Sequence, residues 1–167
     1  VVGADYDDAL FYPGATCRLY GGVIAITAMV RPETPRRAPG LTMKVLKRLK
    51  REFASSIVIR TFGADGEDSS YQGLGADFEH ECLGQLTPQQ ISGLLQATDI
   101  FLDYSTFQAM GLTAMEAAAC GAITIGPLNG GLPEIITDSQ TGVLIDTTDE
   151  QTCFSRTCEL IRNTQQR

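Results

Sequence analysis

One glutamate in an apolar stretch is the first residue in this sequence whose type and position could do chemistry. Glu116 is the only charged residue between Ala109 and Gly126, and a carboxylate in such surroundings is costly unless it has a partner. It follows Leu112 by four residues, about one turn into a predicted helix, near the end whose free N–H groups attract phosphate or sugar oxygens. A carboxylate can accept from both vicinal hydroxyls of a ribose. A solvated glutamate near a helix start is the alternative.

Three arginines in a proline-punctuated loop form the second candidate. Arg31, Arg36 and Arg37 belong to the segment RPETPRR, which follows a predicted buried strand. Nine of the thirteen basic residues lie between Arg31 and Arg60, and residues 61–103 then carry eight acids and no base. In a protein of net charge −7, this asymmetry indicates a site for an anion. Five of the other bases are explained by the solvated face of a predicted amphipathic helix: Lys44, Lys47, Arg48, Lys50 and Arg51.

Composition excludes several other classes of protein. A net charge of −7 speaks against nucleic acid as a partner, and no apolar run is long enough to span a membrane. The chain has no Walker, G-x-G-x-x-G or G-x-S-x-G motif, and His80 matches no catalytic pattern. Its five cysteines include no C-x-x-C pair, so we expect neither a disulfide framework nor a zinc site, in a reducing cytoplasm. The chain opens with Val1 and shows no signal peptide, and we expect it to be part of a longer protein.

Strand and helix patterns alternate along the whole chain. Short apolar runs predict strands at residues 23–30, 56–62, 78–83, 99–104, 122–125 and 143–146. Helices are predicted at about 39–53, from a capping box at Thr87 and Gln90, at 112–120 and at 150–162. The polar, glycine-rich residues 63–75 are expected to form a surface loop. The alternation predicts an α/β fold, a doubly wound parallel sheet of Rossmann-like type.

The position of the two candidates depends on the order of the strands. In open parallel sheets, ligands bind at the carboxyl ends of the strands where the strand order reverses. If the order is 3-2-1-4-5-6, the loops after the first and fourth strands flank that crevice. These loops hold Arg31–Arg37 and Ser105–Gly111, so the two candidates would share one site. We therefore expect Arg31 and Glu116 to face a common pocket.

Two adjoining segments, Ala97–Ser105 and Gln108–Gly121, resemble the donor-binding signature of the retaining GT-B glycosyltransferases of family GT4. Further segments are similar to the family's motifs, and they follow one another in the family's order: Val1–Pro13, Gly84, Gly130–Ile135 and Thr141–Leu144. The resemblance thus covers almost the whole chain and implies one half of a GT-B fold. It implies an interdomain linker at residues 1–14 and a C-terminal domain that binds a nucleotide-sugar donor at residues 15–167.

The family also implies a function for the complete protein. Such an enzyme transfers a sugar from a nucleotide sugar to a glycan or lipid-linked acceptor with retention of configuration, as in polysaccharide biosynthesis for the cell envelope. The reaction takes place in the cleft against a missing N-terminal Rossmann domain, so we expect the isolated domain to be inactive. No cofactor or metal is expected, because the nucleotide sugar is a substrate. The expected location is the cytoplasm, including the inner face of the membrane through the missing domain.

Residue roles carry over position by position. Arg31 matches the arginine that binds the donor diphosphate, and its lysine partner is replaced here by Arg36 or Arg37, of which Arg37 is preferred. Two guanidiniums would also stabilise the leaving diphosphate. Glu116 matches the glutamate that binds the ribose. The resemblance thus assigns catalytic roles to Arg31, Arg37 and Gln108, and contacts with the nucleotide sugar to Arg31, Arg36, Arg37, Ser105, Gly111, Leu112 and Glu116.

One departure from the family pattern leaves alternatives open. The glutamate expected eight residues before Glu116, which contacts the donor sugar, is Gln108 here, and the amide has no negative charge. A degenerate, non-catalytic module that binds a nucleotide sugar or a partner protein is therefore the second hypothesis, and a sugar-nucleotide epimerase is the third. The segment around Gln108 resembles a bacterial subgroup related to rhamnan synthesis, which suggests a dTDP-rhamnose donor. Gly130 and Gly131 are expected to form either a backbone nest near the donor or a plain turn.

Overall fold

The computed structural model describes residues 6–14, 22–136 and 142–165. All of the predicted site residues lie in these ranges, whereas Cys17, Thr141 and the boundary between residues 14 and 15 do not. The strands are β1 Ile24–Met29, β2 Ile57–Phe62, β3 Glu81–Cys82, β4 Ile100–Leu102, β5 Ile123–Pro127 and β6 Gly142–Ile145. The α-helices are α1 Pro39–Phe53, α2 Ser69–Gln72, α3 Pro88–Gln96, α4 Leu112–Ala119 and α5 Glu150–Gln165. Three short 3₁₀ helices, η1 Pro35–Arg37, η2 Ala54–Ser56 and η3 Leu132–Glu134, complete the elements of the described chain.

The six strands form one parallel sheet in the order β3-β2-β1-β4-β5-β6. This is the order on which the predicted placement of the two loops depended, and it confirms the doubly wound Rossmann-like fold. The order reverses between β1 and β4, which pair directly, with Ile26 opposite Ile100. The crevice expected at a topological switch point therefore lies beyond the carboxyl ends of these two strands.

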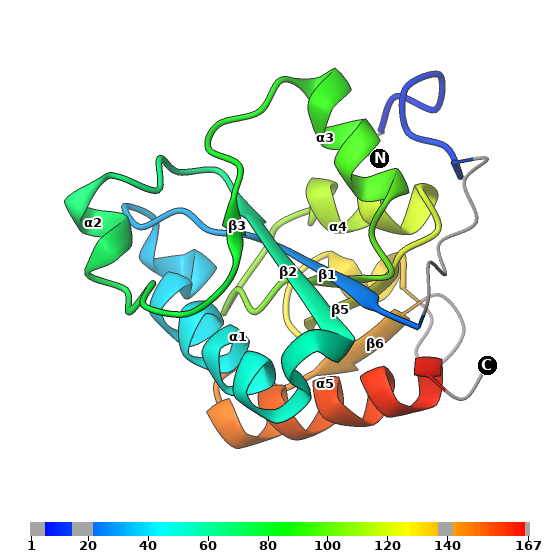
Figure 1. Ribbon diagram of the computed structural model, residues 1–167. Helices are drawn as coiled ribbons and strands as arrows, with labels where there is room; N and C mark the ends of the chain where they lie inside the picture. The colour runs from blue at the N-terminus through cyan, green and yellow to red at the C-terminus, as the bar shows by residue number, and fades with distance from the viewer. Residues whose placement is uncertain (1–5, 15–21, 137–141, 166–167) are drawn as a thin grey trace.

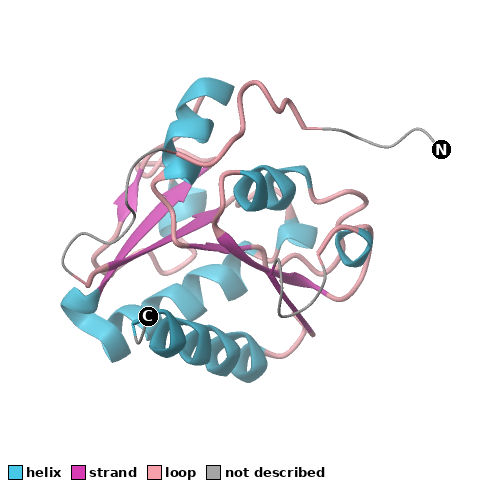
Figure 2. Ribbon diagram, turned by 90° about the vertical axis from the view of Figure 1, so that its right-hand side faces the viewer, coloured by secondary structure: helices cyan, strands magenta, loops and turns pink. Residues whose placement is uncertain are grey.

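Helices cover both faces of the sheet (Figures 1 and 2). Helices α1 and α5 lie side by side on one face, and α3 and α4 lie on the other. Each face has its own apolar core, and alternate residues of a strand serve the two cores: Ile100 and Leu102 of β4 join the first, while Phe101 joins the second. Strands buried on both faces are expected to be apolar, as β4 is throughout and β1 is except at Thr27, whose buried hydroxyl is bonded to that of Thr98 at 2.7 Å.

Helices α1 and α3 begin at the residues that local sequence signals predicted. Thr87 Oγ1 accepts from the backbone N of Gln90, and the Gln90 side chain accepts from the backbone N of Thr87, which completes the capping box of α3. Pro39 occupies the first position of α1, where its missing N–H costs no hydrogen bond. The predicted helices and strands are thereby confirmed, with ends that differ by a few residues.

One predicted loop is wrong in part. Residues 63–75 include the short helix α2, whose Asp68 side chain accepts from the backbone N of Ser70. Tyr71 of α2 is buried, and its hydroxyl is bonded to Thr61 Oγ1 at 2.6 Å and to His80 Nε2 at 2.8 Å. The polar composition concealed this element because it has a single large apolar side chain. His80, which matches no catalytic pattern in the sequence, is half-buried and has a structural contact with Tyr71.

Candidate functional site

Two loops meet at the carboxyl ends of β1 and β4. The first follows β1 and contains Arg31 and η1, and the second follows β4 and runs from Asp103 to Gly111. The backbone N of Thr106 donates to the carbonyl of Arg36 at 2.9 Å, so the loops are joined directly. The strand order therefore brings together the two segments that the sequence analysis placed on one site.

The first loop presents three arginines at the carboxyl end of β1. Arg31 and Arg36 are exposed, and Arg37 is half-buried. Burial lowers the pKa of the Arg37 guanidinium from its ordinary value; the Asp103 carboxylate opposes this change, and the charges of Arg31 and Arg36 add to it. In the described parts of the chain, six other basic side chains form ion pairs and none of these three does. Mutually repelling guanidiniums held in one loop are suited to an anion that carries more than one charge.

The second loop is organised by a buried network around Asp103. Gln108 Nε2 donates to Asp103 Oδ2 at 2.8 Å and lies 3.0 Å from Ser105 Oγ. Ser105 donates to Asp103 Oδ1 from its hydroxyl and, at 3.1 Å, from its backbone N. Thr147 Oγ1 donates to the Ser105 carbonyl at 2.7 Å and thereby anchors the loop to the segment after β6. The three members of the network, Asp103, Ser105 and Gln108, are at most 7% exposed, so Gln108 has one preferred orientation.

Gly130 and Gly131 hold this loop from the other side. Gly130 forms an isolated parallel bridge with Gln108, and the backbone N of Gly131 donates to the Gln108 carbonyl at 2.9 Å. A Cβ on Gly130 would lie 2.0 Å from the Gln108 carbonyl oxygen, and a Cβ on Gly131 would lie 2.2 Å from that of Ala109. The glycines are therefore needed for a close approach of two backbones. Neither sequence alternative, nest or plain turn, identified this role.

The helix that carries Glu116 begins directly after the second loop. Gly111 has φ +65°, a left-handed conformation that favours glycine, and α4 starts at the exposed Leu112. Glu116 is partly buried, and its carboxylate has no hydrogen bond or ion pair to any residue in the described ranges. Burial raises the pKa of this carboxyl above its ordinary value. Within the described chain the carboxylate thus has no partner, and its ligand-binding role stays a prediction.

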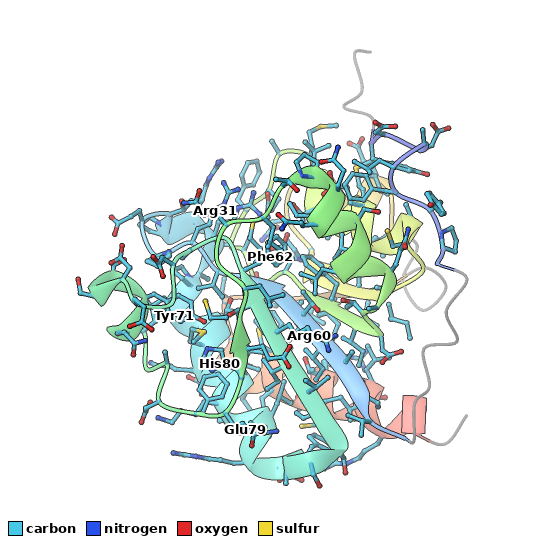
Figure 3. All side chains as sticks on the ribbon, turned by 45° about the horizontal axis from the view of Figure 1, so that its top comes forward. Arg31, Arg60, Phe62, Tyr71, Glu79 and His80 are labelled. Atoms are coloured by element: carbon cyan, nitrogen blue, oxygen red, sulfur yellow. The ribbon has the colours of Figure 1, made fainter. Side chains whose placement is uncertain are left out.

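Arg31 also borders a cavity of about 500 Å³. Figure 3 shows Arg31 and Phe62 at the same end of the sheet, where both contribute to its wall. The wall combines apolar and acidic groups: Met29, Phe62, Leu86 and Ile91, together with Glu33, Asp65 and Asp68. Glu116 is not among the residues that border this cavity. A pocket shared by Arg31 and Glu116 therefore stays a prediction.

A sequence comparison decides the family. The profile described as "Glycosyl transferases group 1" matches residues 27–167, which extend from β1 to the end of the chain. The chain belongs to the group 1 glycosyl transferases. The resemblance noted in the sequence is thereby confirmed, and the fold and the two joined loops agree with it.

This group 1 glycosyl transferase is similar in sequence to larger proteins. It is 30% identical over 158 residues to D-inositol 3-phosphate glycosyltransferase of Mycobacteroides abscessus, and the alignment covers 87% of the chain and 34% of the relative. The chain therefore spans about a third of the length of that relative.

Solved structures share the fold. The C-terminal domain of the group 1 family protein LpcC from Francisella tularensis has a TM-score of 0.74 at 21% identity, covering 95% of this chain and 88% of that domain. HepE from Anabaena, solved with UDP and glucose, has a TM-score of 0.72 at 17% identity, covering 96% of this chain and 46% of HepE. The fold of this group 1 glycosyl transferase is thus that of one half of a GT-B enzyme.

Metal-binding clusters and membrane-spanning helices are both absent from the described residues. No group of three or more His, Cys, Asp or Glu side chains in these residues could hold a metal ion. Among the helices of the described chain, none has the length and apolar character that crossing a bilayer requires.

Asp103 is a residue of the candidate site that the sequence analysis did not single out. It lies at the end of the run DIFLDY, which was assigned to a strand as a whole, but β4 ends at Leu102. An acid at the carboxyl end of a strand beside the switch point is a signal for a site residue, and it could have identified Asp103.

Proposed function

We propose that this chain is the donor half of a retaining GT-B glycosyltransferase and binds the nucleotide diphosphate of a sugar nucleotide. The observation that carries the proposal is the group of three unpaired arginines at the switch point between β1 and β4 in the described chain. A diphosphate supplies the ionic partner that these guanidiniums do not have among the described residues. HepE, which shares the fold, was solved with UDP and glucose, and this supports a nucleotide ligand of the same class.

Each predicted site residue has a role in this proposal. Arg31 and Arg37 bind the diphosphate and stabilise its charge as it leaves, with Arg36 beside them. The free N–H groups at the start of α4, after Gly111 and at Leu112, add donors for phosphate oxygens. Glu116 accepts from the ribose hydroxyls, which would offset the cost of burying an unpartnered carboxylate. Gln108 accepts from a hydroxyl of the donor sugar, and Ser105 holds Gln108 in place.

The remaining parts of the proposal concern the complete protein. Residues 15–167 form the donor domain and residues 1–14 lead into it from an N-terminal Rossmann domain, which completes the cleft. The described part of this leading segment packs on the donor domain, because Phe11 is buried and Ser92 Oγ donates to the Leu10 carbonyl at 2.6 Å. The acceptor is a glycan or a lipid-linked glycan, and the reaction occurs on the cytoplasmic side of the membrane during polysaccharide synthesis. By itself the 167-residue chain binds nucleotide and does not turn over.

Calorimetric titration with UDP, GDP and dTDP tests the proposal. The wild-type chain is expected to release or take up heat with one of them, and Arg31→Gln and Arg37→Gln are each expected to weaken binding by about 10- to 150-fold, the effect of one charge-assisted contact. Arg51→Gln is the control, since Arg51 is exposed on α1 and also without an ion pair in the described chain. No heat with any of the three nucleotides refutes the proposal.

A second candidate is a module that binds a nucleotide sugar without catalysis. The observation that favours it is the amide of Gln108, which places no formal charge next to the sugar. Turnover of a nucleotide sugar by the protein that contains this chain and its N-terminal half, lost in Arg31→Gln, would decide for the enzyme. Binding without turnover in that protein would decide for the module. Release of free epimerised sugar without an acceptor would identify an epimerase.

A further inference from the structure

The buried carboxylate of Asp103 accepts hydrogen bonds at both of its oxygens. Oδ1 accepts from the hydroxyl and the backbone N of Ser105, and Oδ2 accepts from Gln108 Nε2 at 2.8 Å. Because an ionised carboxylate can only accept, the Gln108 amide nitrogen must be the atom that faces it. The second N–H of Gln108 is directed to Ser105 Oγ at 3.0 Å, so both donors of the amide are engaged.

The carbonyl oxygen of Gln108 is left as the free end of the amide. No described residue donates to Gln108 Oε1, and the described chain has no buried side-chain N or O atom without a partner. Oε1 therefore keeps contact with solvent although the residue as a whole is 7% exposed. The network turns Gln108 into an acceptor of fixed direction, on the loop that is bonded to Arg36.

The same carboxylate acts on the arginine loop. The charge of Asp103 raises the pKa of Arg37, against the effects of burial and of the two neighbouring arginines. Asp103 is thus the acid that lies between the group proposed to bind the diphosphate and the group proposed to bind the sugar.

We propose that Asp103 is a positioning residue of the donor site, which orients the Gln108 amide so that the Gln108 carbonyl oxygen faces the donor sugar. Through its hydrogen bond to the amide nitrogen, Asp103 also supplies the negative charge that Gln108 lacks. This inference rests on the proposed function. In this proposal Gln108 and Asp103 act as a pair, and the formal negative charge of the pair lies on Asp103, five residues earlier in the chain.

If Asp103 and Gln108 act as a pair, exchanging the acid and the amide between the two positions should restore what each single variant loses. In Asp103→Asn the side-chain oxygen has to stay with the two Ser105 donors, so the new amide nitrogen faces Gln108. Gln108 then turns its own oxygen toward position 103 and presents its nitrogen to the sugar. In Gln108→Glu two carboxylates meet at the present 2.8 Å contact and repel each other. In the double variant the new amide at position 103 donates to the new carboxylate at position 108 and accepts from Ser105, so an acceptor faces the sugar again. The double variant also has the net charge of the wild type.

The experiment compares these four forms of the 167-residue protein by calorimetry. Each is titrated with the nucleoside diphosphate that binds the wild type, and with its glucose, galactose, mannose and rhamnose conjugates. The dissociation constant of the nucleoside diphosphate, divided by that of its tightest-binding sugar conjugate, gives the contribution of the sugar to binding. Thermal unfolding of each variant verifies that it is folded, and Asp8→Asn, an exposed acid outside the site, is the control for a lost charge.

We expect each single variant to reduce the sugar's contribution by about 5- to 10-fold, the effect of one hydrogen bond, with the affinity for the diphosphate changed less than about threefold. The double variant should recover most of the ratio, which a purely structural role of Asp103 does not predict. An unchanged ratio in Asp103→Asn, or a double variant no better than the worse single one, overturns the role of Asp103 alone. A wild type that binds no nucleotide overturns the proposed function and this inference with it.

Discussion

Replacement of Gly131 by alanine should displace the loop that carries Gln108. Gly131 has φ −83°, which any residue can adopt, so the effect of a methyl group there is purely steric. The new Cβ would lie 2.2 Å from the Ala109 carbonyl oxygen, whereas Cβ contacts under 3.0 Å are essentially not observed. The two backbones must therefore separate by about 0.8 Å, the difference between these distances, because neither contact atom belongs to a flexible side chain.

The size of the effect follows from this displacement. Overpacking costs about 1–3 kcal/mol, and stretching the bond from Gly131 N to the Gln108 carbonyl contributes within that range. For a chain of 167 residues this lowers the midpoint of thermal unfolding by about 3–9 °C. A shift of about 1 Å at a catalytic group costs up to about 100-fold in rate, so turnover by the complete enzyme should fall accordingly.

The assay combines thermal unfolding with calorimetric titration of a nucleoside diphosphate and its sugar conjugate. Gly131→Ala is expected to lose stability and the sugar's contribution to binding, while the diphosphate still binds. The matched control is Gly93→Ala in α3, where a Cβ meets nothing within 4 Å, and this variant should gain about 0.5–1 kcal/mol. A Gly131→Ala variant with the wild-type unfolding midpoint and the wild-type sugar contribution would refute the reasoning.

Three further variants test other parts of the account. Because the pKa of Glu116 is raised in the folded chain, its favourable contribution to stability is present below the unfolded pKa and is lost as pH rises through the folded pKa. Glu116→Gln should therefore unfold at a higher temperature than wild type at about pH 7, but not at about pH 4. The same variant should bind nucleotide more weakly. Equal stability at neutral pH or equal affinity contradicts this. Tyr71→Phe removes the hydroxyl bonded to Thr61 and His80 and should cost about 1–3 kcal/mol in urea unfolding, so an unchanged midpoint contradicts the network. Leu132→Ala, at a fully buried side chain, should cost about 2–5 kcal/mol, and a loss no larger than that of Leu132→Met contradicts the packing.

The elements that the sequence predicted well have strong local signals. The apolar run of β1 and the capping box at Thr87 and Gln90 each determine a local structure from neighbouring residues alone. The strand order was a condition of the prediction, and the observed order brings Arg31–Arg37 beside Ser105–Gly111.

The parts that could not be predicted depend on contacts between residues distant in sequence or on side-chain orientation. The Tyr71 hydroxyl is bonded to Thr61, ten residues earlier in the chain, and no local sequence pattern predicts this bond. Asp103 looked like part of a strand, and its role depends on which way the Gln108 amide is turned. The need for glycine at 130 and 131 comes from a backbone more than twenty residues earlier in the chain.

The most direct test of the central claim is a crystal structure of the chain with the nucleoside diphosphate that it binds. We expect diphosphate oxygens within hydrogen-bond distance of the Arg31 and Arg37 guanidiniums, and ribose hydroxyls on the Glu116 carboxylate. A nucleotide bound elsewhere, or one whose diphosphate contacts neither arginine while Glu116 faces solvent, would contradict it.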